Sequence, residues 1–429
     1  MSEEDIKKIL KENNLPERCI GCGTCRTQHK DLRDVICPSF LDRQFMDYTL
    51  QGRMQIYRAL LNGDLEWDKD VAETFSYCTL CGNCAEQCYL NDTDGFKPIR
   101  AYGADILQSI RFEIIKRGLG PESGEILIKS MRNNNNPYTG SRKMRTRWTK
   151  DICKNDKSLI KDVNKEDAQV LYYAGCTPPY NAPVRCIANS TVSVLNKLNV
   201  DFGYLYAEEV CCGSTVRRMG VEEEFQRVAK LNIAKFKEIH EKRGVDTIVT
   251  ACAGCFRCFN KDYPEVEGYA ELADEVEFKH VVDYLYEKYK AGEWEPTKEV
   301  DMKVTYHDPC HTGRHLHRYP LGSEEEDQSH SVYEQPRELL NAIPGLEFVE
   351  MTRIKANSLC CGAGGGVKTD YPDFAVNTSM RRIDEAEGTG ASSIVSICPF
   401  CHVNLNDGAK SAKKDIPTYD LMQLLDMAL

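Results

Sequence analysis

The sequence lacks an apolar run of the roughly 18 to 20 residues that a membrane-spanning helix needs. Its first residues, Met1 to Asp5, are acidic and polar, and they do not read as an export signal. Basic residues are also scarce relative to acidic ones, 55 against 66, and the net charge of −11 gives no reason to expect nucleic acid as a partner. We therefore expect a cytoplasmic protein, either free or held at the membrane through a partner subunit.

The glycine patterns of nucleotide-binding sites are missing as well. The run Gly362 to Gly366 carries no Walker lysine pattern, and the sequence has no flavin or nicotinamide fingerprint. Cysteine, in contrast, is abundant, with 21 residues in a chain of 429. Without an export signal, this content points away from disulfides and toward metal ligation.

Ten of the cysteines form two sets with the same arrangement, which indicates a repeated structural unit. Each set contains a lone cysteine, then an adjacent pair followed by glycine, then Cys-x-x-Cys. The sets are Cys176, Cys211, Cys212, Cys252 and Cys255, and Cys310, Cys360, Cys361, Cys398 and Cys401. Five thiols exceed the four that a tetrahedral zinc ion or an ordinary four-iron cube requires. Adjacent side chains diverge in extended backbone, so each pair suits two irons of one cluster, whereas buried apolar cysteine is the alternative.

Eight further cysteines form two ferredoxin-like runs near the N-terminus. In bacterial ferredoxins the fourth cysteine of each Cys-x-x-Cys-x-x-Cys run ligates the other [4Fe-4S] cube. The predicted ligands are Cys19, Cys22, Cys25 and Cys88 for one cube, and Cys78, Cys81, Cys84 and Cys37 for the other. Structural zinc is the alternative, although zinc usually takes two Cys-x-x-Cys pairs and not triplets.

The apolar spacing predicts helices first and alternating strands and helices later. Helices are expected over residues 1–18, within 38–77 and over 99–117. From residue 168 the expected strands are 170–174, 202–206, 247–250, 303–306, 346–351 and 393–397, separated by helices over 184–198, 221–242, 333–342 and 372–387. The repeated cysteines follow the carboxyl ends of strands, where open α/β sheets bind ligands. Two such repeats can face each other and place both cysteine sets in one cleft.

The expected fold is therefore a multidomain α+β and α/β protein. We predict a helical ferredoxin-like domain with two [4Fe-4S] clusters over 1–130, a basic linker over 131–165, and two pseudo-symmetric α/β repeats over 166–295 and 296–429. The linker contains four consecutive asparagines followed by five basic residues, which indicates a solvated segment or a docking surface for an acidic partner. Residues 314–333 lengthen the second repeat and are expected to form a surface loop that could cover the cleft.

Three cysteines fall outside these motifs: Cys153, Cys186 and Cys258. Cys258 completes a Cys-x-x-Cys-x-x-Cys triplet with Cys252 and Cys255. The second repeat has no counterpart to it, so we treat Cys258 as a bystander.

Two ferredoxin-type runs followed by two complete Cys-Cys-Gly (CCG) sets resemble the family of D-type heterodisulfide reductase subunits, in which a ferredoxin-like C part and a catalytic B-like part are fused. The resemblance extends from Cys19 to Cys401. Similar arrangements occur in iron–sulfur subunits of anaerobic glycerol-3-phosphate, glycolate and lactate dehydrogenases, and in one component of a benzoyl-CoA reductase complex.

The resemblance implies that each CCG set holds a noncubane [4Fe-4S] cluster and that the mixed disulfide of coenzyme M and coenzyme B, a substrate of methanogenesis, lies between the two. Two cubane clusters in the N-terminal domain would then carry electrons from a membrane b-type cytochrome or a soluble flavin subunit. Each noncubane cluster would supply one of the two electrons that reduce the disulfide to two thiols. The alternatives are an electron-relay subunit of a flavin dehydrogenase or of a benzoyl-CoA reductase complex, and a non-redox scaffold stabilised by zinc or clusters.

The product thiols need protons, and the substrate implied by the resemblance carries anionic groups. His307 and His311 flank Cys310, and they are candidates for proton donors or for packing support around the cluster. The basic residues near the ligands in sequence are Arg185, Arg314, Arg318 and Lys368. Each of these could bind the anionic groups or could simply be solvated.

Overall fold

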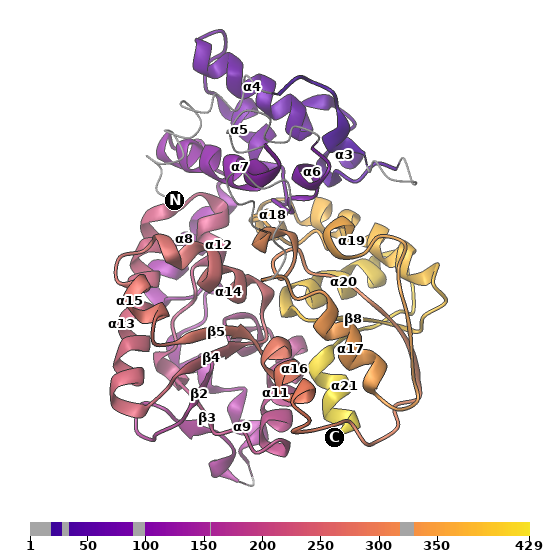
Figure 1. Cartoon of the computed structure of the whole chain (residues 1–429). Coiled ribbons are helices and arrows are strands. Elements are labelled where there is room, and N and C mark those ends of the chain that lie inside the picture. The colour runs from indigo at the N-terminus through magenta and orange to yellow at the C-terminus, as the bar shows by residue number, and fades with distance from the viewer. Residues whose placement is uncertain (1–18, 28–33, 89–98, 155, 318–329) are drawn as a thin grey trace.

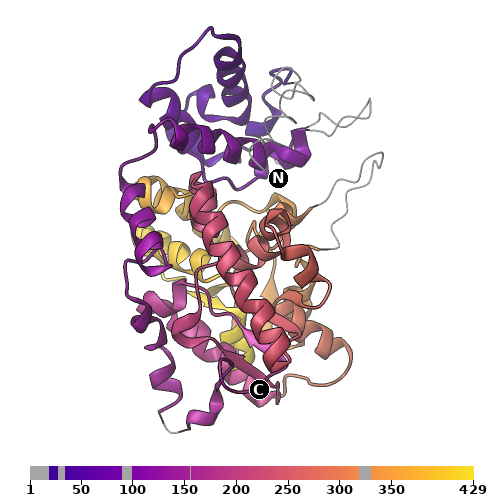
Figure 2. The same cartoon turned by 90° about the vertical axis from the view of Figure 1, so that its left-hand side faces the viewer.

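The computed structural model describes residues 19–27, 34–88, 99–154, 156–317 and 330–429. A helical N-terminal domain lies at one end of two α/β repeats that stand side by side (Figure 1), and the C-terminus lies at the opposite end (Figure 2). The helix expected over residues 1–18 lies outside the described residues. The structure therefore shows a helical domain followed by two parallel-sheet units.

The N-terminal domain is built from short helices around a small apolar core. Its helices are α3 (Pro38–Arg43), α4 (Leu50–Asn62), α5 (Lys69–Ser76), α6 (Asn83–Glu86) and α7 (Ile99–Lys116). The side chain of Thr49 caps α4 by accepting a hydrogen bond from the Gly52 amide, as is usual for a threonine at a helix start. The helical spacing predicted within 38–77 corresponds to α4 and α5, which bury Met54 and Phe75.

The first repeat contains a five-stranded parallel sheet in the order β1-β3-β2-β4-β5. The strands are β1 (Lys161–Asp162), β2 (Val170–Tyr172), β3 (Phe202–Tyr204), β4 (Thr247–Thr250) and β5 (Glu277–His280). The helices of this unit are α10 (Thr177–Tyr180), α11 (Arg185–Lys197), α12 (Ser214–Met219), α13 (Glu222–Arg243), α14 (Ala253–Arg257), α15 (Tyr269–Ala273) and α16 (Val281–Lys290). Strands β2 and β4 are buried along most of their length, as is typical of strands covered on both faces.

The second repeat contains a four-stranded parallel sheet in the order β7-β6-β8-β9. The strands are β6 (Met302–Tyr306), β7 (Leu346–Val349), β8 (Ser393–Ser396) and β9 (Thr418–Asp420). The helices are α17 (Glu334–Ala342), α18 (Val367–Asp370), α19 (Pro372–Glu387), α20 (Pro399–Ala412) and α21 (Leu421–Ala428). This order matches β3-β2-β4-β5 of the first repeat, and a symmetry axis relating the two units stays a prediction.

The two repeats share one hydrophobic core. Helix α11 of the first repeat packs against α21 of the second, and one cluster of buried residues includes Val192 and Leu195 together with Leu421 and Leu425. The ring of His280 also bonds the Ile397 carbonyl oxygen across the boundary, at 3.0 Å. The relative position of the repeats is therefore set by buried contacts.

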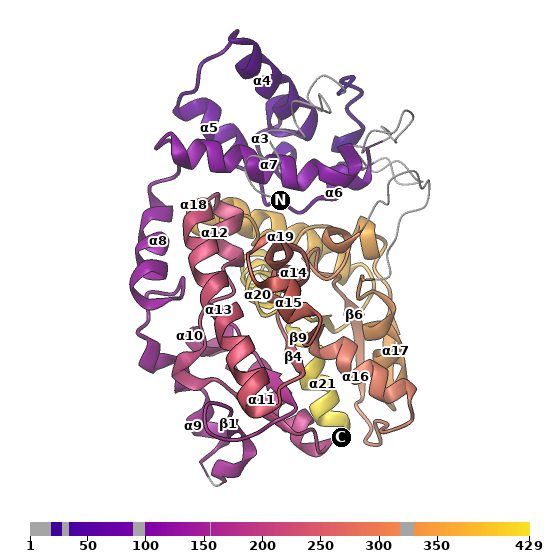
Figure 3. The same cartoon turned by 60° about the vertical axis from the view of Figure 1, so that its left-hand side comes forward.

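The segment over 131–165 differs from the solvated linker that its composition indicates. Helix α8 (Ser123–Asn134) descends beside α12 and α13 from the helical domain to the first repeat (Figure 3). Asn135 ends α8 in the left-handed conformation, a position that asparagine tolerates well. Arg145 and Trp148 are buried against the first repeat, and β1 joins its sheet. Of the five basic residues only Arg145 is buried, and Arg142, Lys143, Arg147 and Lys150 are exposed, as predicted for solvated charge. The segment is therefore packed through Asn136, Arg145 and Trp148, while its other basic side chains face the solvent.

The residues around 314–333 also differ from the expected surface loop, as far as they are described. Arg314, His315 and Leu316 are buried, and the Val332 amide bonds the Thr312 carbonyl oxygen at 2.7 Å. Residues 318–329, which include Arg318, lie outside the described part of the chain. The described ends of this segment are therefore interior structure between the helical domain and the second repeat.

Candidate iron–sulfur centres

The cysteines of both repeats lie at the carboxyl ends of the central strands. Cys176 follows β2 and Cys310 follows β6, while Cys252 and Cys398 occupy the N-cap positions of α14 and α20. The glycine after each adjacent pair adopts a positive φ, 88° at Gly213 and 86° at Gly362. A side chain at Gly362 would place its first carbon 2.2 Å from the Ala375 carbonyl oxygen. Each CCG turn therefore needs glycine both for its backbone conformation and for close packing.

All ten repeat cysteines line one cavity, whose volume is about 120 Å³. They are joined there by Tyr138, Arg218, His311, Lys368 and Phe400 and by the glycines of the run that follows Cys361. None of the described residues that line the cavity is an aspartate or a glutamate. A lining rich in soft thiols and free of carboxylates suits iron–sulfur chemistry better than a hard cation.

The thiols of the two sets are in electrostatic contact with one another. Hydrogen bonds from Cys252 of the first set and from Cys401 hold the pKa of Cys398 well below its usual range, although burial opposes the shift. Hydrogen bonds from Cys360 and Cys401 likewise lower the pKa of Cys361. Burial raises the pKa of Cys310 to about 12. Deprotonating all ten thiols in this buried space therefore requires a bound cationic centre.

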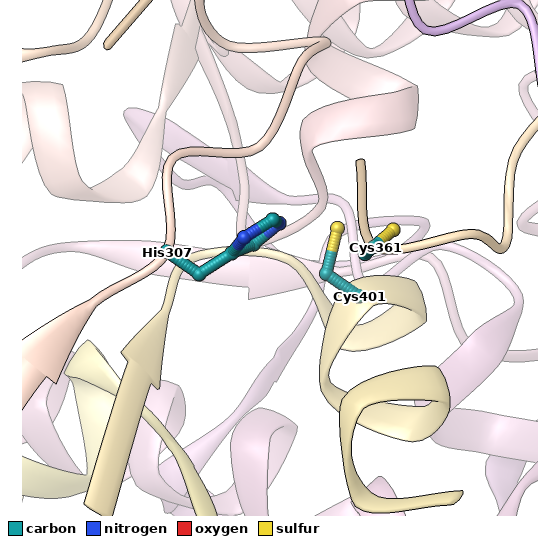
Figure 4. Close-up of side chains that lie close together, drawn as sticks. All are labelled: His307, Cys361 and Cys401. Carbon is teal, nitrogen blue, oxygen red and sulfur yellow. The ribbon is translucent and has the colours of Figure 1, made fainter. Parts of the chain in front are cut away.

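His307 and His311 occupy different environments, although both flank Cys310. His307 points toward Cys401 and Cys361 (Figure 4), and the ligand atoms of these three residues lie within 4.8 Å of one another. Arg382 Nε donates a hydrogen bond to His307 Nδ1 at 3.2 Å. Burial and the nearby guanidinium of Arg382 lower the pKa of His307 to about 3. His307 is therefore a neutral ring whose Nε2–H faces the sulfurs.

His311, in contrast, lines the cavity itself. Its ring centroid lies 4.6 Å from that of His315, and Arg257 Nε donates to His315 Nδ1 at 3.0 Å. Burial, together with Arg257, holds the pKa of His311 well below its usual range. Of the two histidines predicted from sequence, His311 is the one that can contact a molecule in the cavity.

The N-terminal cysteines are brought together in two further cavities, each in the grouping predicted from the ferredoxin pattern. Cys19, Cys22, Cys25 and Cys88 line one cavity. Cys37, Cys78, Cys81 and Cys84 line the other. Burial raises the pKa of Cys25 to about 12 and that of Cys37 to about 11. Each group therefore brings four thiols around one space, and four is the number of ligands that a four-iron cube requires.

The second of these cavities adjoins the second repeat. Cys360 Sγ donates to Thr79 Oγ1 at 3.4 Å, and the thiols of Cys81 and Cys360 interact directly. The thiols of Cys252 and Cys398 interact in the same way across the central cavity. The cysteine groups thus follow one another from the helical domain to the second repeat and then to the first.

The basic residues predicted from sequence have different positions. Lys368 lines the central cavity, where its Nζ bonds Asn404 Oδ1 at 2.7 Å and pairs with Asp407. Arg314 is buried and bonds backbone carbonyls at the border with the helical domain, and Arg185 does not line the cavity. Arg218, which follows the first CCG turn, lines the cavity and pairs with Asp262.

Arg145 contacts a predicted ligand directly, although the sequence did not indicate this role. Its Nη2 donates to Cys176 Sγ at 3.6 Å, and its Nη1 donates to the Gly175 carbonyl oxygen at 2.6 Å. It also pairs with Glu209, which precedes the first CCG turn. The only signal of this role was a run of basic residues, which is more typical of a solvated surface.

The leftover cysteines lie outside the central cavity. Cys258 is fully buried, and its Sγ donates to the Cys212 carbonyl oxygen at 3.3 Å. Cys153 and Cys186 are half-buried beside the core that the two repeats share. In the described part of the chain, no helix is both long and apolar enough to cross a membrane.

Comparison with known proteins identifies the parts of the chain. Residues 170–260 and 304–406 match the model of a cysteine-rich domain named CCG, and residues 16–91 match that of a 4Fe-4S dicluster domain. A solved structure, described as a hypothetical protein from Helicobacter pylori, aligns with the whole chain and 76% of its own length at a TM-score of 0.54 and 12% identity. This likeness concerns the fold alone.

Several of the curated relatives are oxidoreductases or subunits of oxidoreductases. The D-type subunit of dihydromethanophenazine:CoB–CoM heterodisulfide reductase from Methanosarcina mazei is 36% identical over 90% of this chain and 85% of its own length. The B-type subunit of fumarate reductase (CoM/CoB) from Methanothermobacter marburgensis is 28% identical over 99% of this chain and 73% of its own. A probable iron–sulfur-binding oxidoreductase from Bacillus subtilis is 30% identical over 86% of this chain and 48% of its own. The chain belongs to the CCG family of iron–sulfur oxidoreductases that includes the D-type heterodisulfide reductase subunits.

Proposed function

We propose that this protein is the catalytic subunit of a disulfide reductase that converts the mixed disulfide of coenzyme M and coenzyme B into two thiols. The observation that carries the proposal is the central cavity, which all ten cysteines of the two CCG sets line together. A molecule in this cavity would have one five-cysteine set on each side. The heterodisulfide reductase relatives favour this substrate, since their names contain both coenzymes.

The ten cysteines would hold two noncubane [4Fe-4S] clusters, each supplying one of the two electrons that the reduction requires. The other residues of the cavity would bind and orient the substrate. Arg218 and Lys368 line the cavity, each paired with an aspartate behind the lining, and they would donate hydrogen bonds to the anionic groups at the two ends of the disulfide. His311 lines the cavity as a neutral imidazole, and a ring N–H would donate a hydrogen bond to a departing thiolate.

The N-terminal domain would receive the electrons. Its two four-cysteine cavities fit two cubane [4Fe-4S] clusters, and the second of them adjoins Cys360 of the second repeat. The electrons would come from a partner protein, either a b-type cytochrome in the membrane or a soluble flavin protein. The relatives include subunits of larger enzymes, which supports a hetero-oligomeric assembly.

An electron-relay role is the second candidate, since the relatives also include an EtfAB:quinone oxidoreductase from Syntrophomonas wolfei. In that role the chemistry would take place on a flavin partner and this chain would only conduct electrons. The presence of all ten cysteines at one cavity favours catalysis, because two clusters beside one substrate could each supply one of the two electrons.

The test is anaerobic oxidation of a reduced viologen by the purified holoprotein, with and without the mixed disulfide. We expect disulfide-dependent turnover, with about sixteen irons per chain from four four-iron clusters. Cys212→Ala should abolish turnover, whereas the matched control Cys186→Ala, outside the cavity, should leave it unchanged. Full iron content without turnover in the unmodified protein would contradict the proposal and favour the relay.

A further inference from the structure

The loop from Cys78 to Cys81 forms the border between the helical domain and the second repeat. The Thr79 hydroxyl accepts a hydrogen bond from Cys360 Sγ at 3.4 Å. A side chain at Gly364 would place its first carbon 2.7 Å from the Thr79 carbonyl oxygen, and one at Gly365 would come within 2.6 Å of the Cys78 carbonyl oxygen. The two glycines therefore allow the backbone of the second repeat to lie directly against this loop.

Arg111 of helix α7 holds the first end of the loop. It is 3% exposed, and its guanidinium donates hydrogen bonds to backbone carbonyls from three parts of the molecule. These acceptors are Phe75, Ser76 and Cys78 in the helical domain, Arg218 in the first repeat and Gly365 in the second. The bond to Arg218 is 2.9 Å long and that to Ser76 is 3.0 Å. Arg111 thus joins the loop to both repeats.

Arg314 of the second repeat holds the other end. It is 6% exposed, and its Nε donates to the Cys81 carbonyl oxygen at 2.6 Å. Its Nη1 donates to the carbonyl oxygens of Ala356 and Ser358, both at 2.8 Å, in the segment that leads to Cys360. The same guanidinium therefore bonds the loop that bears Cys81 and the chain that bears Cys360.

Arginine suits this task because of its shape and its charge. The guanidinium offers five donors in a rigid plane and stays protonated, whereas an ammonium group is a compact point charge on a flexible stem. Among the described residues, the hydrogen-bond acceptors of these two guanidinium groups are backbone carbonyl oxygens and include no carboxylate. Both residues therefore fix the geometry of backbone segments, and the Cys78 thiol near Arg111 and the Cys81 and Cys310 thiols near Arg314 add an electrostatic attraction.

We propose that Arg111 and Arg314 are positioning residues that clamp the Cys78–Cys81 loop at a fixed distance from Cys360, and so set the rate at which an electron passes from the helical domain to the second repeat. The proposal rests on the proposed function, since it takes Cys78, Cys81 and Cys360 as ligands of neighbouring clusters. The clamp itself is a property of the chain, and it can be measured independently of turnover.

The experiment compares the full-length holoprotein with its Arg111→Lys and Arg314→Lys variants. Arg117→Lys is the matched control, since Arg117 lies just after α7 and pairs with Glu113 while remaining partly exposed. After reduction by a viologen, we expect the second-repeat centre to be reduced about tenfold more slowly in both clamp variants, because small displacements of reacting groups slow their reaction strongly. We also expect faster amide hydrogen exchange over 76–83 and 363–366, with the iron content unchanged.

Unchanged exchange and unchanged reduction rates in both lysine variants would overturn the proposal. Loss of iron from the helical domain with normal exchange over 363–366 would also overturn it, because the arginines would then support ligand binding and not alignment. These outcomes are distinct from failure of the proposed function. A protein that does not reduce the disulfide would still show the exchange difference and the slower internal electron transfer.

Discussion

Arg145 shows how a single buried guanidinium can hold the first cysteine set in position. Its side chain is 1% exposed and bonds Glu209 and Cys176 together, so the segment after α8 is tied to the CCG turn through one guanidinium. A buried ion pair has a large desolvation cost, and removing one partner leaves the other buried group without its hydrogen bond. Substitution should therefore destabilise the fold.

We expect Arg145→Ala to lower the free energy of unfolding by about 1 to 3 kcal/mol, because burial raises the pKa of Glu209 to about 8 and this buried carboxyl would lose its hydrogen-bond donor. Anaerobic denaturant unfolding of the holoprotein would measure the change. The neighbouring exposed Arg147 is the control, and Arg147→Ala should stay within about 0.5 kcal/mol of the unmodified protein. Equal effects of the two substitutions would contradict the role assigned to Arg145.

His307 leads to a second prediction at this scale. Its Nδ1 accepts from Arg382, which leaves the proton on Nε2, and this buried nitrogen lies near Cys361 and Cys401 without a hydrogen-bond partner in the described structure. A hydrogen bond to a ligand sulfur stabilises the more negative, reduced cluster and raises its potential. We expect His307→Leu to shift the midpoint potential of the second-repeat centre to a lower value, measured by an EPR-monitored redox titration. A normal potential combined with slower proton uptake would instead assign His307 the proton role considered from the sequence.

The predicted cysteine ligands and the buried arginines differ in how well the sequence reveals them. The eighteen predicted ligands could be named and grouped because cysteines at fixed spacing carry the chemistry in their own side chains. Arg111 and Arg145 could not, and Arg314 was named only as a candidate for anion binding, since the partners of these arginines are mostly backbone carbonyls, which leave no pattern in the sequence. Assignment of the eighteen cysteines as ligands stays a prediction until iron is measured.

At the scale of the elements, strand and helix ends place the functional groups. The expected strands within 170–174, 247–250 and 393–397 are confirmed as β2, β4 and β8, and each leads into a cysteine of the central cavity. Strands β5 and β9 were missed, because each is short and combines apolar with polar residues. Both end in a residue that caps the next helix, His280 for α16 and Asp420 for α21.

The Asp420 cap gives a pH-dependent prediction. Burial raises the pKa of Asp420 from its ordinary value of 3.8 to about 8, and the Cys398 thiol adds a smaller upward contribution. The folded state therefore keeps a proton that the unfolded state has lost, so this residue makes stability fall as the pH rises from about 4 toward about 8. Asn at this position still offers the Oδ1 acceptor for the Met422 amide.

We expect Asp420→Asn to flatten the dependence of stability on pH over this range, measured by anaerobic unfolding at several pH values from about 5.5 to 8. The variant should gain stability relative to the unmodified protein as the pH rises. A parallel dependence in the two proteins would show that Asp420 is ionised in the folded state.

At the scale of the whole molecule, the thiol-lined cavities connect stability with iron. Eighteen cysteines surround three cavities that lie within or between the domains, and the core of the helical domain is small. Any group that binds the folded state alone stabilises it, and a domain with few apolar contacts depends most on such binding. The abundance of thiols could be predicted from the composition. That ten of them line one cavity could be seen only once the fold was known.

We expect removal of iron by an anaerobic chelator under denaturant-free conditions to lower the melting temperature and to expose the helical domain first. Proteolysis followed by mass spectrometry would measure the order, with early cuts within 34–88 and later cuts in the two repeats. Simultaneous cleavage of the helical domain and both repeats would indicate that the clusters stabilise the molecule as one cooperative unit.

The core that α11 and α21 share has a consequence for the independence of the repeats. A chain divided near residue 295, between α16 and β6, would leave the apolar surface of each piece uncovered, including Leu195 on one side and Leu421 on the other. Each piece alone should aggregate, whereas the two produced together should recombine into one complex. The repeats would then behave as complementary halves of a single folding unit. Their association would depend on the shared core and not on the peptide link between them.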